Sequence, residues 1–328
     1  MKAAFEAAGG REDLVQRVFV SGDLRPDLPE TNGQHLLVRC FNKTEEDIAK
    51  FLKRCREKIQ PYFPLDSILI VIDTDADTRL KADTLKAVMS NREKISIPVV
   101  PVLVSGPSSI PNWTRKLNGG LKFLHGSRVS DGTLLITSFD SVPSNPEALG
   151  SLSDAPVPIL SVRDTPAPYA PKRALKFLAQ DDDAIRSEVQ EILSRVRNQC
   201  LSGNPVLIKA DLDILPAVVR NSMMVWKLRP LFDTGGFDPY SAKIANGQED
   251  TAKVIELLLR DYGEFPDDVP VLRYADTRFQ TTQLVTALGA GESHTDKYNR
   301  ERTATTIMAK RLVDTLGIIP IEERDFQW

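Results

Sequence analysis

Short apolar runs alternate with amphipathic segments along the first half of the chain. Four runs predict strands: 35–41, 67–73, 97–104 and 132–140. Three segments between them predict helices: 44–59, 81–92 and 113–126. The run at 67–73 is apolar at nearly every position, which is typical of a strand buried on both faces of a parallel sheet. Regular strand–helix alternation of this kind predicts a doubly wound α/β sheet.

The first helix carries its own start signal. Thr44 is followed three residues later by Asp47, which fits a capping box in which Asp replaces the usual Glu or Gln. The first turn is acidic and the last turn is basic, as the helix dipole favours. We therefore expect a helix that begins directly after Thr44.

The second half of the chain is less regular. Five prolines predict that residues 155–172 are extended. An apolar pattern at 204–215 predicts a strand followed by a turn. Three further segments predict helices, and one predicts a strand: helices at 182–198, 249–263 and 302–316, and a strand at 269–275. We divide the chain into four parts: 1–33, 34–150, 151–268 and 269–328.

Composition and charge exclude several classes of protein. The chain has 328 residues, of which 41% are hydrophobic and 27% are charged, enough for one large domain or two smaller ones. Its net charge of −3 gives no reason to expect nucleic acid or a membrane surface as a partner. No apolar stretch is long enough for a transmembrane helix, and the N-terminus lacks the apolar core of a signal peptide. We expect a cytoplasmic protein.

Metal and phosphate chemistry would have to rest on carboxylates. The three cysteines lack zinc-site spacing, and only three histidines are present. A carboxylate-based site favours a hard cation such as Mg or Mn. The glycine motifs of dinucleotide-binding and P-loop proteins are missing. Asp73 and Asp140 follow predicted strands, at the sheet edge where α/β proteins bind ligands.

Four stretches, in this order, resemble parts of one known family: 36–52, 69–79, 113–143 and 231–263. The family is the GT-A nucleotide-sugar glycosyltransferases, especially the large inverting, family-2-like group. The fourth stretch is the most specific, because a Gly-Gly-Phe-Asp turn precedes a Glu-Asp pair and an amphipathic helix. The resemblance implies a GT-A-like single domain with a Rossmann-like mixed sheet flanked by helices. Residues 34–150 would bind the nucleotide sugar, and residues 151–268 would form the acceptor and catalytic half.

The resemblance also implies an activity and a set of site residues. The enzyme would move a sugar from a nucleoside-diphosphate donor to an acceptor hydroxyl with inversion, with Asp250 as the base and Glu249 as its substitute. Eight residues would bind the donor: Asn42, Asp73, Asp75, Arg115, Asn118, Asp140, Gly235 and Gly236. Asp140 and His294 would hold a Mg or Mn ion.

One departure from the family pattern leaves the activity open. Where the family commonly has Asp-x-Asp, this chain has Ser138-Phe139-Asp140. A metal-independent enzyme, an atypical substrate and an inactive descendant all fit this change. A non-catalytic nucleotide-sugar-binding protein and a nucleotidyltransferase are the alternatives. The latter normally has a Gly-rich basic loop where this chain has Phe-Asn-Lys-Thr-Glu-Glu-Asp.

The same residues also have structural interpretations. Asp250 could cap the helix that follows it, and Asp140 could be a turn residue. Arg115 and Lys116 fit a solvated helix face. Tryptophans at 113 and 226 fit the core better than a ligand-stacking surface.

Overall fold

A computed structural model describes the chain over these residues: 17–19, 26–40, 43–73, 78–105, 112–152, 161–164, 172–203, 208–237, 249–260, 262 and 271–276. The chain forms two compact units. The first comprises Met1–Phe139, Trp226–Lys243 and Arg324–Trp328, and the second comprises Asp140–Val225 and Ile244–Glu323. Each is described here by itself.

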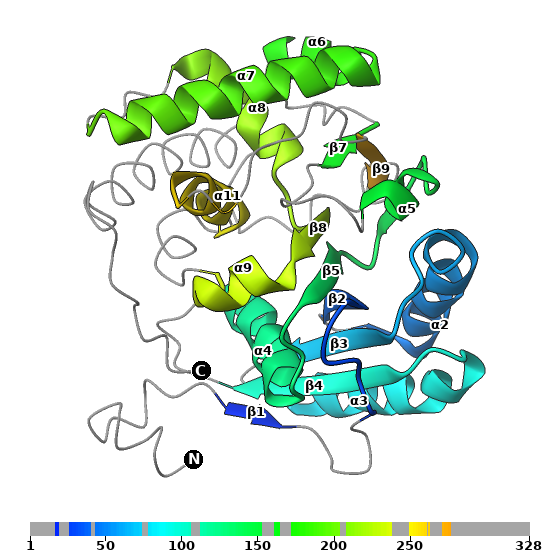
Figure 1. Cartoon of the computed structure of the whole chain (residues 1–328). Coiled ribbons are helices and arrows are strands. Elements are labelled where there is room, and N and C mark those ends of the chain that lie inside the picture. Colours follow the sequence, from blue (N-terminus) through cyan, green and yellow to red (C-terminus); the bar gives the residue numbers. More distant parts are fainter. Residues whose placement is uncertain are drawn as a thin grey trace, which may run out of the picture. The chain divides into compact units, whose positions relative to one another are not determined.

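A six-stranded mixed sheet has the order β1-β4-β3-β2-β5-β8 (Figure 1); unit 1 contains its first five strands and the last two residues of β8. Its strands are β1 (Arg17–Phe19), β2 (Gly33–Cys40), β3 (Ser67–Asp73), β4 (Val99–Ser105), β5 (Gly132–Thr137) and β8 (Met223–Lys227). Strands β2, β3, β4 and β5 are parallel to one another, and β1 is antiparallel to β4. Every residue of β3 is buried, as its apolar sequence predicts. The expected α/β class with a mixed sheet flanked by helices is confirmed.

The order of the strands creates a switch point between β2 and β5. From β2 the chain steps outward through β3 to β4, and it then returns to place β5 on the other side of β2. Helices α2 (Glu45–Arg54), α3 (Thr78–Asn91) and α4 (Asn112–Gly126) make these connections. In sheets of this kind, ligands bind beyond the carboxyl ends of the strands at the switch point.

Close packing holds α4 on one face of the sheet. A Cβ atom on Gly120 would lie 2.2 Å from Leu37 Cδ1 and 3.4 Å from Val71 Cγ2, so a larger residue there would require the Leu37 side chain or the helix to move. Side chains alternate along a strand, so Arg39 and Asp73, two residues further on, face the same side as Leu37 and Val71. The packing therefore brings α4 over Asp73, which ends β3, and over Arg39, the next-to-last residue of β2.

Helix α2 starts as the sequence predicts. The Thr44 hydroxyl accepts from Asp47 N, and the Asp47 carboxylate accepts from Thr44 N, which completes the capping box. The helix continues into a π-helical turn at Cys55–Ile59, where the buried Cys55 and Ile59 extend its apolar face. All three cysteines of the chain are buried and free.

Unit 2 combines a small sheet with a group of helices. Strands β6 (Ser141–Pro143), β9 (Leu272–Asp276) and β7 (Ser161–Arg163) pair in the order β6-β9-β7. The helices are α5 (Ala148–Leu152), α6 (Lys172–Leu178), α7 (Asp182–Leu201), α8 (Lys209–Val218) and α11 (Glu249–Leu259). Helix α7 packs against α11, and α6 packs against α8. The short helix α9 (Leu228–Asp233) follows β8 and belongs to unit 1.

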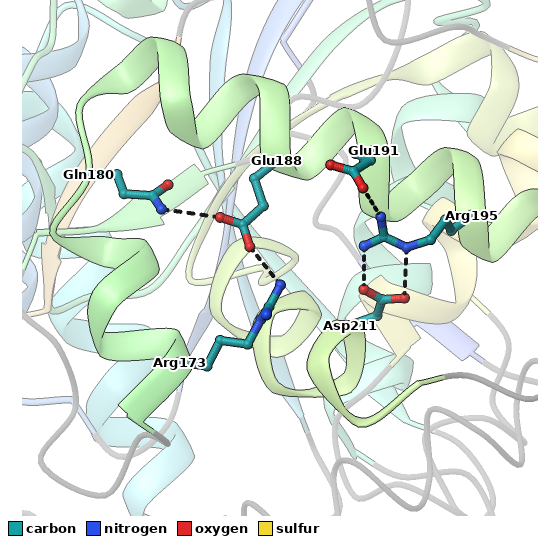
Figure 2. A network of polar contacts seen from close by, with 6 residues as sticks. All are labelled: Arg173, Gln180, Glu188, Glu191, Arg195 and Asp211. Atoms are coloured by element: carbon teal, nitrogen blue, oxygen red, sulfur yellow. Dashed lines mark hydrogen bonds and ion pairs between the residues drawn. The ribbon is translucent and has the colours of Figure 1, made fainter.

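Polar contacts tie α6, α7 and α8 together (Figure 2). Arg195 on α7 donates to both carboxylate oxygens of the fully buried Asp211 on α8, at 2.7 and 3.4 Å. Arg195 also contacts Glu191. Nearby, Glu188 accepts from Arg173 on α6 at 3.0 Å and from Gln180 at 3.2 Å.

Two predictions about secondary structure are wrong. Residues 209–218 form helix α8 rather than the end of a strand and a turn. Their buried residues, including Asp211, Leu212, Leu215 and Val218, recur at helical spacing. Strand β5 ends at Thr137, so Asp140 lies in the following turn and not at the strand end.

Several predictions fall on residues outside the described part of the chain. These are site residues Asn42, Asp75 and His294, most of the extended segment at 155–172, and the helix at 302–316. Within the described residues, no helix is long and apolar enough to cross a membrane.

Candidate functional site

The first group of candidate residues lies in unit 1, where β2 and β3 end beside the first turns of α4. Asp73, the last residue of β3, meets Arg115 of α4. Arg115 Nε and Nη2 donate to the same oxygen, Asp73 Oδ2, at 3.2 and 2.9 Å. Both side chains are almost completely buried. Two residues that the sequence assigned separately to the donor thus form one buried ion pair.

Lys116 is buried beside this pair. Its Nζ donates to the Cys40 carbonyl at 2.8 Å, at the end of β2. Burial lowers the pKa of Lys116 to about 7, and the negative charge of Asp73 opposes the shift. The interpretation of Arg115 and Lys116 as a solvated helix face is therefore wrong. Both point toward the sheet because their partners, on β2 and β3, lie under the start of α4.

Two cations near the end of β2 lie over aromatic rings. The Arg39 guanidinium is 5.3 Å from the ring centre of Trp113, and Lys43 Nζ is 5.4 Å from that of Phe139. Phe139 is buried against Phe51, whereas 37% of the Trp113 surface is exposed. The core assignment is thus wrong for Trp113, which lies at the surface, while Trp226 is buried.

The Gly-Gly turn binds α4 through its backbone. Gly235 and Gly236 have φ angles of +73° and +75°, a conformation that glycine adopts without strain. The next residue, Phe237, exchanges two hydrogen bonds with the Asn118 side chain, each 2.8 Å long. Asn118 therefore holds the turn against α4 with both ends of its amide group.

The second group lies in unit 2, where α11 begins. The helix starts at Glu249, so Asp250 is in its first turn and is not the residue that precedes the helix. Both acids are buried. Asp250 Oδ2 accepts from Asn221 N, and Oδ1 accepts from Thr251 N, both at 2.8 Å.

The surroundings of Asp250 favour its protonated form. Burial, and next the charge of Glu249, raise the pKa of Asp250 to about 7. The two backbone N–H donors and Arg220 act in the opposite direction. A carboxyl group with a pKa near neutrality can accept and release a proton at physiological pH, which suits a general base.

Asp140 is half-buried in the turn between β5 and β6. Among the described residues, no three His, Cys, Asp or Glu side chains gather where they could hold a metal ion. Those residues therefore do not form a complete protein site for a divalent cation.

Sequence reasoning missed four contributors: Arg39 and Lys116 in unit 1, and Arg220 and Asn221 in unit 2. Their only sequence signal is position, since Arg39 stands near the end of a predicted strand and Lys116 follows Arg115. Their partners are distant along the chain: Lys116 lies 76 residues from Cys40, and Asn221 lies 29 residues from Asp250.

Comparisons with known proteins give only distant similarity. No family model and no curated protein matches the chain. A solved structure that is similar in shape is the mannosyltransferase Ktr4p from S. cerevisiae in complex with GDP, which is 14% identical. The match covers 92% of this chain and 86% of that one, with a TM-score of 0.34. At this level, the similarity does not establish a shared fold or activity.

Proposed function

We propose that the chain is a glycosyltransferase that moves a sugar from a nucleoside-diphosphate donor to an acceptor hydroxyl with inversion. The observation that carries the proposal is Asp250, a buried carboxyl group with a raised pKa at the start of α11. Its position after the Gly-Gly turn, next to Glu249, matches the family pattern that the sequence resembles.

In the proposed reaction, Asp250 accepts the proton of the acceptor hydroxyl. The acceptor oxygen forms a bond to the anomeric carbon while the bond from that carbon to the diphosphate oxygen breaks. The electron pair of the broken bond leaves with the diphosphate, so the transfer is a single displacement. The hydrogen bonds from Asn221 and Thr251 hold the carboxylate in place.

The donor would bind to unit 1 at the carboxyl ends of its strands, and basic side chains there would face the diphosphate. Asp140 would bind a Mg or Mn ion, with His294 as a further ligand. The cation, when bound, would neutralise charge on the leaving diphosphate. We assign no step to the cation, because the described residues supply no complete set of ligands for it.

Release of free nucleoside diphosphate tests the proposal. The purified chain is incubated with UDP-glucose, UDP-N-acetylglucosamine, GDP-mannose and dTDP-glucose, with and without Mn. We expect slow hydrolysis of at least one donor even without an acceptor. Asp250→Asn should lower that rate by about 10²- to 10⁴-fold.

The matched control is Asp183→Asn, which removes an exposed carboxylate from the first turn of α7. It should leave the rate unchanged. Donor affinity and the melting temperature show whether Asp250→Asn is folded. A folded Asp250→Asn protein with the full rate would refute the role of Asp250.

A non-catalytic nucleotide-sugar-binding protein is the second candidate, favoured by Ser138 in place of the usual acid. It predicts a rise in melting temperature with nucleotide sugars and no release of nucleoside diphosphate.

A further inference from the structure

Two asparagine–glycine pairs lie in the described part of unit 1, in different surroundings. Asn32–Gly33 is at the start of β2, and Asn118–Gly119 is inside α4. In such a pair, the glycine backbone nitrogen can attack the side-chain amide of the asparagine, because glycine has no side chain to shield that nitrogen. A third pair, at 246–247, lies outside the described residues. The two described pairs therefore offer the same chemistry in two settings.

Asn32 is exposed and weakly held. Its φ angle is +58°, in the left-handed region that asparagine tolerates better than most residues with a side chain. Among the described residues, none forms a hydrogen bond with its side-chain amide. The nearest backbone anchor is the Glu30 carbonyl, which accepts from Ser130 N and Oγ at 2.8 and 3.0 Å. The Asn32 amide is therefore able to turn toward the nitrogen of Gly33.

Asn118 is held at both ends of its amide group. Its Nδ2 donates to the Phe237 carbonyl and its Oδ1 accepts from Phe237 N, each at 2.8 Å. Gly119 lies within the hydrogen-bonded backbone of α4. Attack at Asn118 would have to break both bonds to Phe237 and distort the helix, so the fold protects this pair.

We propose that Asn32 is a site of spontaneous modification, at which the folded chain converts asparagine into aspartate and isoaspartate. The Gly33 nitrogen forms a bond to Asn32 Cγ, and the bond from Cγ to the amide nitrogen breaks. The amide nitrogen leaves with the electron pair of that bond, takes up the proton of the Gly33 nitrogen, and departs as ammonia. A cyclic succinimide remains, and water opens it at either carbonyl carbon. The reaction needs neither a donor nor Asp250, so it is independent of the proposed function.

The two products differ in their effect on β2. Isoaspartate adds one carbon atom to the main chain before Gly33, whereas aspartate leaves the main chain unchanged. Gly33 has no room to move, since a Cβ atom on it would lie 2.5 Å from His35 Nε2 and 2.9 Å from Pro29 Cγ. Gly33 is also paired in register with Gly132 of β5. Isoaspartate should therefore weaken the pairing of β2 with β5.

Peptide mapping of the aged chain tests the proposal. The folded chain is kept in mildly alkaline buffer, and mass spectrometry of its digest follows the conversion of each amide into an acid. Labelling with an isoaspartyl methyltransferase measures the isoaspartate. We expect Asn32 to react several-fold faster than Asn118. In concentrated urea the contacts of Asn118 with Phe237 are lost, and the two rates should become similar.

Two variants at the same position serve as controls. Asn32→Gly removes the amide and suits the positive φ angle. It should lose the methyltransferase signal of this peptide and keep its melting temperature during the incubation. Asn32→Asp reproduces one product without lengthening the main chain. The freshly purified Asn32→Asp protein should melt close to the fresh wild type, whereas the aged wild type should melt lower as its isoaspartate content rises.

Three results would overturn the proposal: no conversion of Asn32 in the folded chain, equal rates at Asn32 and Asn118 in the folded chain, or rates in urea that differ as much as in the folded chain. An aged Asn32→Gly protein that loses as much melting temperature as the aged wild type would refute the effect on β2.

Discussion

Two buried aspartates, one in each unit, have opposite electrostatic surroundings. Asp73 in unit 1 accepts two hydrogen bonds from the guanidinium of Arg115. Asp250 in unit 2 accepts from two backbone N–H groups and lies next to a second buried acid, Glu249. Asp73 is the last residue of β3 and Asp250 is in the first turn of α11, and both were candidates on sequence grounds.

The difference shows that burial alone does not indicate what a carboxylate does. A carboxylate paired with arginine is well suited to hold a cationic side chain in place. A carboxylate beside another acid is poorly stabilised as an ion, and it is therefore suited to take up a proton. The charge of the neighbouring side chain, more than burial, therefore separates Asp73, which holds Arg115 in place, from Asp250, the candidate base.

The largest effect on stability is expected from breaking the pair in unit 1. Asp73→Ala leaves the buried Arg115 without its carboxylate and should lower the free energy of unfolding by about 3–5 kcal/mol. The double variant Asp73→Leu with Arg115→Met should recover much of this loss, because it removes both charges of the pair together. Urea unfolding measures both. If Asp73→Ala were as stable as the wild type, the ion pair with Arg115 would contribute nothing to stability. It would then not set Asp73 apart from Asp250.

His35 provides a buried titratable group outside both candidate groups. Burial lowers the pKa of His35 to about 4, and the charge of Asp66 opposes the shift. The unfolded chain therefore binds the proton more readily, so stability is full above about pH 6.5 and falls as the pH drops toward 4. The loss should be about 3 kcal/mol.

Unfolding of the wild type and His35→Gln in urea, at pH 7 and pH 4.5, checks this expectation. On going from pH 7 to pH 4.5, the free energy of unfolding should fall more for the wild type than for His35→Gln. A constant difference would contradict the lowered pKa.

Asp250 should show the opposite pH dependence. Because its pKa is raised to about 7, its contribution to stability is full below about pH 4 and is lost as the pH rises through 7. The reaction needs the ionised form, so kcat/KM should rise about tenfold per pH unit below 7 and then level off. A pH–rate profile of donor hydrolysis measures this. A flat profile between pH 5 and 8 would argue against Asp250 as the base.

A smaller effect is expected in the helices of unit 2 (Figure 2). Arg195→Ala removes the guanidinium from the buried Asp211, but Arg195 is itself about one-third exposed. We expect a loss of about 1–3 kcal/mol. Arg173→Ala breaks a more exposed pair with Glu188 and should cost less than about 1 kcal/mol. Thermal unfolding of the two variants measures both losses. If Arg173→Ala lost more stability than Arg195→Ala, burial of the acidic partner would not determine the size of the effect.

Local signals in the sequence were sufficient for much of unit 1. The capping box of Thr44 and Asp47 identified the start of α2, and the apolar run of β3 identified a buried parallel strand. Both signals depend on neighbours within a few residues. The helix α8 was missed because its apolar residues also fit a short strand, a known ambiguity of short apolar runs.

The candidate sites were less predictable because their contacts join distant parts of the chain. The sequence selected Asp73, Arg115 and Asp250 but gave no sign that the first two form a pair. It assigned Lys116 to solvent because lysine is rarely buried, whereas in the structure Lys116 Nζ donates to the Cys40 carbonyl, 76 residues away along the chain.

Gly120 links the core of unit 1 to the residues at the start of α4, although it touches neither a ligand nor a charged residue in the contacts described. Its missing side chain sets how deeply α4 rests on Leu37 and Val71. A methyl group there would require either the Leu37 side chain to move or the helix to rise, and a rise would carry Trp113, Arg115 and Lys116 with it. Natural selection that preserves the positions of the residues at the start of α4 would therefore also act on Gly120 in the core. Among related sequences, Gly120 should vary together with the size of residue 37 more than with any residue at the start of α4.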